Sequence, residues 1–292
     1  MTSLFHVSTK GMALALLGFS LLSFGDALIK YLSPFYSTHS LVLYNSIFGL
    51  LTILLFSPWL GGLKATLLDR RKGLHLLRGG LVFVQLSLIV YAFSELPLAT
   101  AYAMAFVAPL FSTLLAIPLL KDHVGSKQMM AIILGFVGVL VILRPGVIPL
   151  EWAALAALAS AFFFSLVNIT ARHMRNSQHT LMSWGFYPHL VIISILILFF
   201  FDDLELVRAE DLGLMAALGA VSVAGAITLA RSFAFVSTAT AASFHYVQML
   251  WGVLFGFVLF GDVIELWTGL GAAIVIASGL WLIRIEKAKP VG

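Results

Sequence analysis

The chain has 292 residues, of which 61% are hydrophobic and 10% are charged, and its mean hydropathy is +1.05. A soluble domain carries roughly 25% charged residues, so this composition excludes a water-soluble globular protein and indicates an integral membrane protein. Long unbroken apolar runs exclude a transmembrane β-barrel, and the absence of cysteine excludes disulfides and thiolate metal sites.

Ten apolar runs are predicted to be transmembrane helices, because about 20 apolar residues span a bilayer. In chain order they cover residues 11–31, 39–57, 76–94, 98–120, 128–143, 150–172, 181–201, 212–235, 239–260 and 266–283. The third and fourth runs nearly abut, as do the eighth and ninth, so each pair is predicted to form a hairpin. Pro109, Pro118 and Pro188 are predicted bends. The fold class is therefore predicted to be an all-α polytopic membrane protein.

The distribution of basic residues predicts the orientation of these helices. With the N-terminus in the cytoplasm, 13 of the 17 Lys and Arg residues fall on the cytoplasmic side. The positive-inside rule favours that arrangement. The acidic loop around residues 202–211 then lies outside. We expect a protein of the cell inner membrane with both termini in the cytoplasm.

The sequence contains an internal repeat. A shift of 140 residues superposes Thr100 on Thr240, Asp122 on Asp262 and Arg144 on Arg284, and a shift of 142 places Asp26 on Asn168 and Lys30 on Arg172. Five spans per copy is an odd number, so the second copy starts on the opposite side of the membrane. We therefore predict two inverted five-helix repeats, residues 11–144 and 150–284, an architecture typical of secondary transporters.

Several short motifs carry a family resemblance. They include Arg78-Gly79, Leu96-Pro97-Leu98-Ala99-Thr100-Ala101, Gly135-Phe136-Val137-Gly138-Val139, Arg144-Pro145-Gly146 and Phe260-Gly261-Asp262. With these motifs the chain resembles the EamA-type branch of the drug/metabolite transporter superfamily. The resemblance implies a ten-helix carrier of two five-helix halves. Substrates of that family include amino acids, nucleotides and cofactors such as riboflavin and S-adenosylmethionine, and both exporters and importers occur.

The chain departs from the family pattern at a few positions. Asp122 and Asp262 stand where the family often has Glu, Asn45 stands near a frequent Arg, and Gln248-Met249 stands near a frequent Pro. The resemblance therefore does not transfer a substrate to this chain.

Polar side chains inside the spans are candidates for the transport site, because each costs about 2.5–3.5 kcal/mol to insert at mid-membrane. The substrate-binding candidates are Gln85, Tyr91, Tyr102, Asn168, His245, Tyr246, Gln248 and Trp251. The candidates for coupling to protons are His245, Asp26 and Arg231. The spacing of His245, Gln248 and Gly252 predicts that they share one helical face.

Each of these candidates also has a structural interpretation. His245 is a proton site or a neutral side chain hydrogen-bonded between helices. Asp26 contributes to the site or pairs with Lys30 four residues later, and Arg231 points inward or extends to the membrane surface. The aromatic candidates wall a pocket or belong to interfacial belts.

The function predicted is secondary transport of a small polar metabolite by alternating access. The protein is predicted to be an exporter or an exchanger, and proton coupling is left open. A metabolite importer or facilitator of the same fold is the alternative. An intramembrane aspartyl protease using Asp26 and Asp262 is a second class of function. We expect no enzymatic activity, cofactor, metal or nucleic-acid partner; the expected partners are the solute, membrane lipid and a second copy of the chain.

Overall fold

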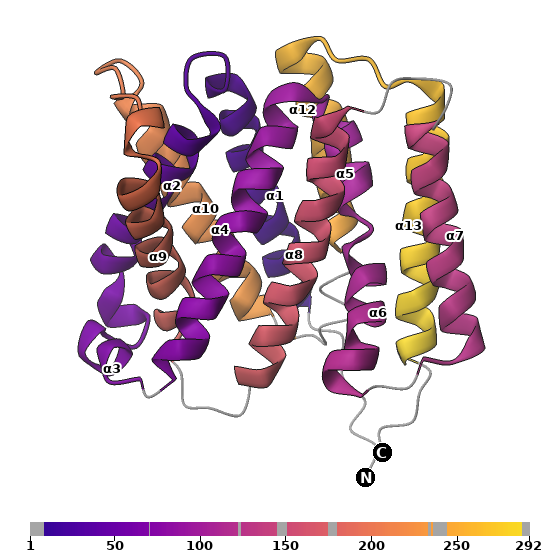
Figure 1. Ribbon diagram of the computed structural model, residues 1–292, viewed down its shortest axis with the longest axis horizontal. Helices are drawn as coiled ribbons and strands as arrows, with labels where there is room; N and C mark the ends of the chain where they lie inside the picture. The colour runs from indigo at the N-terminus through magenta and orange to yellow at the C-terminus, as the bar shows by residue number, and fades with distance from the viewer. Residues whose placement is uncertain are drawn as a thin grey trace.

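The computed structural model is entirely helical in the part of the chain that it describes, residues 9–69, 71–121, 124–144, 151–174, 180–232, 235 and 244–287 (Figure 1). Its α-helices are α1 (Thr9–Leu32), α2 (Thr38–Leu55), α3 (Leu63–Leu67), α4 (Lys72–Glu95), α5 (Leu98–Ala105), α6 (Ala108–Leu120), α7 (Ser126–Leu143), α8 (Trp152–Met174), α9 (Ser183–Phe199), α10 (Leu212–Ser232), α12 (Val247–Phe260) and α13 (Leu266–Lys287). The 3₁₀ turns are η1 (Ser57–Trp59), η2 (Phe201–Asp203) and η3 (Phe244–Tyr246).

Seven of these helical segments are long and apolar enough to cross a membrane. They are α1, α2, α4, the α5–α6 segment, α7, α8 and α10. Three shorter apolar segments are α9, residues Phe244–Phe260 and residues Leu266–Leu282. The all-helical prediction is confirmed, and the protein is a multi-pass helical membrane protein.

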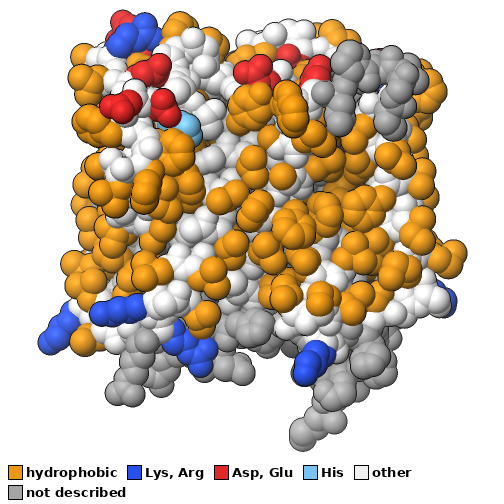
Figure 2. All heavy atoms as spheres, viewed as in Figure 1, with side chains coloured by type: hydrophobic (Ala, Val, Ile, Leu, Met, Phe, Trp, Pro, Cys, Tyr) orange, Lys and Arg blue, Asp and Glu red, His pale blue; other side chains and the backbone are white. Residues whose placement is uncertain are grey.

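Charged side chains gather at the two ends of the helix bundle, and hydrophobic side chains cover the surface between them (Figure 2). One end, which we call the acidic edge, carries the α9–α10 loop with Asp202, Asp203 and Glu205, and the α12–α13 loop with Asp262 and Glu265. The opposite end, the basic edge, carries Lys64, Arg71, Lys72 and Lys127. An apolar belt between two charged rims is the surface expected of a protein embedded in lipid.

The acidic edge is fastened by hydrogen bonds between distant segments. The Tyr36 hydroxyl donates to Asp211 Oδ2 at 2.6 Å, and the Ser37 backbone N–H donates to Glu205 Oε2 at 2.7 Å. The Tyr44 hydroxyl donates to the Glu205 carbonyl at 3.1 Å. These contacts hold the α1–α2 loop and the first half of α2 against the α9–α10 loop.

The helices pack side by side along the longest axis of the molecule, which is horizontal in Figure 1. The helix α1 contacts α10 and α12, whereas α8 contacts α4, α5 and α6. The pair α2 and α9 packs beside α4 and α10, and α7 packs along α13 at the opposite end of the molecule. The central elements α1, α5, α8 and α12 therefore bring together residues from both halves of the sequence.

The predicted fourth span is interrupted. The helix α5 ends at Ala105 and α6 begins at Ala108, with Phe106 and Val107 between them. Pro109 occupies the first turn of α6, where its missing N–H and fixed φ are tolerated. The span is interrupted next to Pro109, whereas Pro118 and Pro188 lie inside helices that continue past them. The three predicted bends stay predictions. The predicted tight turn before residue 239 lies outside the described residues.

Glycines allow α7 and α13 to approach closely. A Cβ atom built on Gly271 would lie 2.6 Å from the Gly138 carbonyl oxygen, and one on Gly138 would lie 2.9 Å from the Gly271 carbonyl oxygen. Backbone atoms cannot move aside as a flexible side chain does, so these glycines are needed for the contact. Close contacts of this kind are how helices associate in membranes.

Replacing Gly271 by alanine is therefore expected to destabilise the protein by about 1–3 kcal/mol, the usual cost of overpacking. The measurement is thermal unfolding in detergent. The matched control is Gly80→Ala in α4, where an added Cβ meets nothing within 4 Å. That change should be neutral or stabilise by up to about 1 kcal/mol, because glycine weakens a helix interior. Equal unfolding temperatures for the two variants would contradict this account of the α7–α13 contact.

Candidate functional site

One face of α1 carries a stripe of side chains that reaches the centre of the bundle. Phe19, Ser23, Asp26 and Lys30 follow one another at intervals of three or four residues, so they line one side of the helix. Phe19 is 7% exposed and Ser23 is fully buried. Through this stripe α1 contacts the α5 helix, the η3 turn and the α12–α13 loop.

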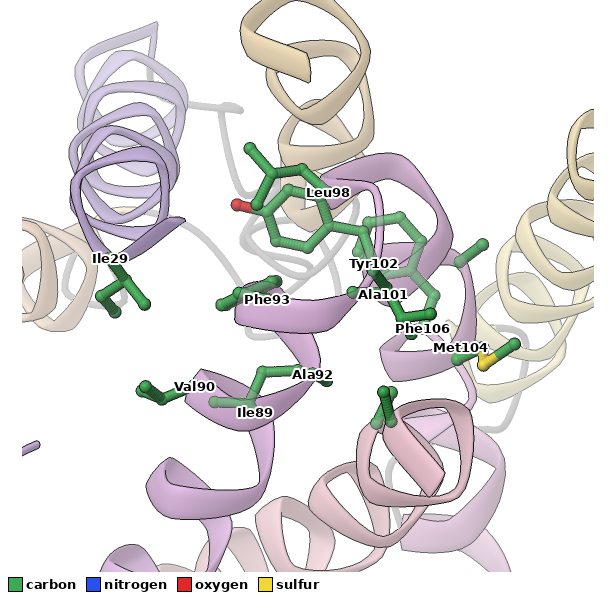
Figure 3. Packing of buried hydrophobic residues seen from close by; sticks show 14 of the residues in the cluster. Ile29, Ile89, Val90, Ala92, Phe93, Leu98, Ala101, Tyr102, Met104 and Phe106 are labelled. Carbon is green, nitrogen blue, oxygen red and sulfur yellow. The ribbon is translucent and has the colours of Figure 1, made fainter. Parts of the chain in front are cut away.

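Asp26 is joined to Tyr102 of α5 by a short hydrogen bond. The Tyr102 hydroxyl donates to Asp26 Oδ2 at 2.6 Å, and the tyrosine is 3% exposed. A hydrogen bond to an ionised carboxylate is about twice as strong as a neutral one. The Tyr102 ring packs against Phe93 and, one turn along α5, against Phe106, with centroid distances of 5.3 and 6.1 Å (Figure 3). The carboxylate is therefore held at the edge of an aromatic cluster.

His245, from the second half of the sequence, lies between two aromatic rings from the first half. Its imidazole stacks on Phe19 at a centroid distance of 4.9 Å and meets Phe106 edge-on at 5.1 Å. Phe106 also meets the neighbouring Tyr246 edge-on at 5.3 Å. The break between α5 and α6 thus lies directly against the turn that precedes α12.

The start of α12 adds polar groups to this cluster. Gln248 is 6% exposed in the first turn, and the Trp251 indole N–H donates to Ser20 Oγ of α1 at 2.8 Å. A Cβ atom on Gly252 would lie 2.5 Å from the Tyr102 ring, so the missing side chain lets α12 reach α5. His245 lies in the η3 turn, which runs directly into α12, and its side chain is hydrogen-bonded to Gln248.

The alternative interpretation of Asp26, a pair with Lys30, is not what the structure shows. Lys30 Nζ lies 3.6 Å from Asp262 Oδ2 and donates to the Leu96 carbonyl at 2.7 Å, whereas Asp26 is bonded to Tyr102. The four-residue spacing made the local pair geometrically available. Partners from other helices take its place because both side chains point into the bundle.

Four predicted site residues lie away from this cluster. Gln85 donates to Ser160 Oγ at 3.4 Å and links α4 to α8. Tyr91 lines an open cavity of about 440 Å³ at the acidic edge. Arg231 is exposed in the last turn of α10. Asn168 is exposed on α8, one turn after Phe164, whose ring lies 6.5 Å from His245.

The sequence reasoning missed Phe19, Ser20, Ser23 and Phe106, which contribute the contacts or line the stripe around Asp26 and His245. A signal for them was available. Tyr102 and Phe106 are four residues apart, and Phe19, Ser23 and Asp26 repeat at helical spacing. The four missed residues have apolar or hydroxyl side chains, and the criterion of a costly polar group in the membrane does not select such side chains.

The two carboxylates of the protease hypothesis are held separately. Asp26 is bonded to Tyr102, and Asp262 faces Lys30. A protease pair needs two carboxylates that share a proton or a water, and no contact between Asp26 and Asp262 is present among the described residues. Within that same part of the chain, no group of three or more His, Asp or Glu side chains is placed to hold a metal ion.

Comparison with known proteins gives the family. The model of the EamA-like transporter family matches residues 9–144 and again residues 151–284. The chain belongs to the EamA-like transporter family. Membership identifies the protein as a transporter, and it gives the protease hypothesis no support.

Individual relatives agree with this assignment. The chain is 24% identical over 265 residues to an S-adenosylmethionine uptake transporter of Rickettsia prowazekii, covering 91% of this chain and 89% of the relative. It is 24% identical to a pseudopaline exporter of Pseudomonas aeruginosa, covering 95% of this chain and 97% of that protein. A crystal structure with 16% identity has the same fold, with a TM-score of 0.62 over 96% of this chain and 100% of the other.

Proposed function

We propose that the protein is a secondary transporter that moves a small polar metabolite across the cell inner membrane by alternating access. The family and the named relatives support the class of solute carrier. The two halves, residues 11–144 and 150–284, are proposed to be five-helix units of opposite orientation. Exchange of conformation between two such units exposes one central site to either side in turn.

The helix boundaries support two related halves. At a shift of 140 residues, α4 starts at the position of α10, and α7 starts at the position of α13. The helix α6 ends where α12 ends under the same shift, and at a shift of 142 residues α1 ends where α8 ends. Agreement at several independent boundaries is unexpected for unrelated helices.

The helix contacts support the same relationship. If each helix is replaced by its equivalent in the other half, the α1–α10 contact becomes α8–α4 and the α2–α10 contact becomes α9–α4. The α6–α8 contact likewise becomes α12–α1. All six contacts are present. Side chains follow this exchange. Gly138 packs on Val275. Under the 140-residue shift, Gly138 corresponds to Ser278 and Val275 corresponds to Gly135. The corresponding pair, Ser278 and Gly135, is also in contact.

The observation that carries the proposal is the contact between Phe106 and Tyr246. These residues are equivalent under the 140-residue shift. Phe106 lies in the break between α5 and α6, and Tyr246 is the last residue of the η3 turn before α12. An interrupted helix near the middle of a membrane protein is the usual frame of a transport site. Asp26, Tyr102, His245 and Gln248 surround this meeting point.

The orientation proposed places the basic edge in the cytoplasm. Lys64, Arg71, Lys72 and Lys127 lie there among the described residues, and the acidic loops lie at the other edge (Figure 2). The positive-inside rule favours this placement. The first turn of α1 and the last turn of α13 both lie at the basic edge in Figure 1, which supports cytoplasmic chain ends.

The polar groups of the cluster fit a solute with hydrogen-bond donors and a flat or apolar part. Asp26 supplies an acceptor, Gln248 supplies both kinds of group, and the rings around His245 supply stacking surfaces. We propose export or exchange as the direction of transport. Uptake is the alternative, favoured by the relative named as an uptake transporter.

Purified protein in liposomes tests the proposal. Vesicles are loaded with unlabelled S-adenosylmethionine, riboflavin or an amino acid, and entry of the same labelled compound is followed. A carrier gives saturable entry that is accelerated by the internal compound, and an imposed pH gradient changes its rate if transport is proton-linked. Linear entry without acceleration by internal solute identifies a pore and would overturn the proposal.

A further inference from the structure

Lys30 joins three elements at the acidic edge of the bundle. Its Nζ donates to the Leu96 carbonyl in the α4–α5 turn at 2.7 Å and lies 3.6 Å from Asp262 Oδ2 in the α12–α13 loop. The ammonium also lies 5.4 Å from the centroid of the Phe260 ring. The side chains of Lys30 and Asp262 are only 13% and 20% exposed, so water screens this ionic contact weakly.

The end of α12 positions Asp262 firmly. Gly261 adopts φ 69°, the left-handed conformation that favours glycine. The Asp262 N–H then donates to the Gly256 carbonyl at 2.9 Å, and the Gly261 N–H donates to the Phe257 carbonyl at 3.2 Å. These two bonds form the closing turn that often ends a helix. The position of the Asp262 backbone is therefore fixed relative to the last turn of α12.

Asp262 depends on Lys30 for compensation of its charge. Its Oδ2 atom is buried and accepts no hydrogen bond from the described residues. A buried carboxylate oxygen without a partner is costly, and the nearby ammonium offsets that cost. The contact is consequently stable only while α1 and the end of α12 stay together.

This three-way contact lies between the candidate site and the acidic edge. Lys30 is one turn beyond Asp26 on α1, and Leu96 lies two residues before the span that carries Tyr102. The contact ties α1 and the α4–α5 turn of the first half to α12 of the second half. Those elements surround the Asp26–Tyr102 bond, so opening the site toward this edge requires that they separate.

We infer that Lys30, Asp262 and the Leu96 carbonyl form an ionic gate that closes the transport route at the acidic edge and parts when the route opens there. This inference rests on the proposed function. The sequence adds an independent observation, because the repeat shifts place Arg172 and Asp122 at the positions of Lys30 and Asp262. Opposite charges thus occupy the matching positions of both repeats.

The gate is tested by the accessibility of a buried reporter. Ser23, on the same stripe of α1 and fully buried, is changed to cysteine in a chain that has no other cysteine. A membrane-impermeant maleimide is applied from the acidic side. Asp262→Asn and Lys30→Met should each raise the labelling rate about tenfold or more, as loss of a hydrogen-bonded charge predicts. Lys30→Met keeps the apolar stem over the Phe260 ring.

The matched control is Glu265→Gln. It breaks an ionic contact between Arg144 at the end of α7 and the same α12–α13 loop, away from the α1 stripe. Labelling should stay at the rate of the parent protein. The double variant of Lys30 and Asp262 should label no faster than the quicker single variant, because both remove one contact. Additive effects, or equal acceleration by Glu265→Gln, would mean general loosening and would overturn the gate.

The assay is independent of the proposed function, since labelling needs no transported solute. Unchanged labelling in both gate variants, with normal unfolding temperatures, overturns the gate even if the protein transports. Accelerated labelling in a protein that shows no saturable exchange supports the gate and counts against the carrier. If one variant fails to fold, the other alone decides the outcome.

Discussion

Transport is expected to fall at least about tenfold when Asp26 is replaced by asparagine, while the protein keeps its fold. The bond at stake is the one between the Asp26 carboxylate and the solute. Hydrogen bonds to charged groups contribute about 1.5–3 kcal/mol, and each 1.4 kcal/mol is a factor of ten in binding. Asparagine keeps an oxygen that accepts from the Tyr102 hydroxyl, so the link between α1 and α5 survives. The variant loses only the ability of the carboxyl group to carry a charge or a proton. Exchange in liposomes and thermal unfolding in detergent measure the two properties.

Two variants accompany Asp26→Asn. Asp202→Asn makes the same chemical change at an exposed position of the acidic edge, and transport should stay normal. Tyr102→Phe removes the hydroxyl donor and should lower the unfolding temperature more than Asp26→Asn does, because the carboxylate loses its partner. Normal exchange by Asp26→Asn would remove Asp26 from the site. If Asp26 carries the coupling proton, this variant also loses any acceleration by a pH gradient.

The second large effect is expected at His245. Alanine there removes the ring that stacks between Phe19 and Phe106, and aromatic pairs contribute about 0.5–1.5 kcal/mol each beyond burial. His245→Ala should therefore lower both the unfolding temperature and the transport rate. His245→Phe restores a ring without nitrogen atoms, so it should recover stability but not transport.

The comparison of the two variants separates packing from chemistry at this position. Transport by His245→Phe at the rate of the unchanged protein would show that the ring alone matters, which contradicts a role in solute or proton binding. His39→Ala is the matched control. That histidine lies 3.5 Å from Asp203 at the acidic edge, far along the chain from the cluster, and its loss should leave exchange unchanged.

Much of the helical frame was predictable because it follows from hydropathy. The run 11–31 became α1 (Thr9–Leu32), and the run 128–143 became α7 (Ser126–Leu143). The interruption at Phe106 was not predictable to the residue, because these positions are as apolar as their neighbours. Only Pro109 marked it, and proline at Pro118 or Pro188 left its helix continuous.

The candidate site was predictable in part. Tyr102, His245 and Gln248 were found as polar groups in apolar runs, and the structure brings them to one cluster. Hydropathy does not say which side of a helix faces the centre. For that reason Tyr91 was placed in the site although it lies at the edge, and Phe19 was overlooked. The partner of Lys30 depends on which helices meet, which no local spacing reveals.

The central claim is that the two halves lie in opposite orientations in one membrane. Lys72 and Leu212 start equivalent helices of the two halves, and both are exposed. Each is changed to cysteine singly in the naturally cysteine-free chain, and intact cells are treated with a membrane-impermeant maleimide. Residue 212 is expected to be labelled in intact cells, and residue 72 only after the membrane is opened. Labelling of both positions from the same side would contradict the opposite orientation of the halves.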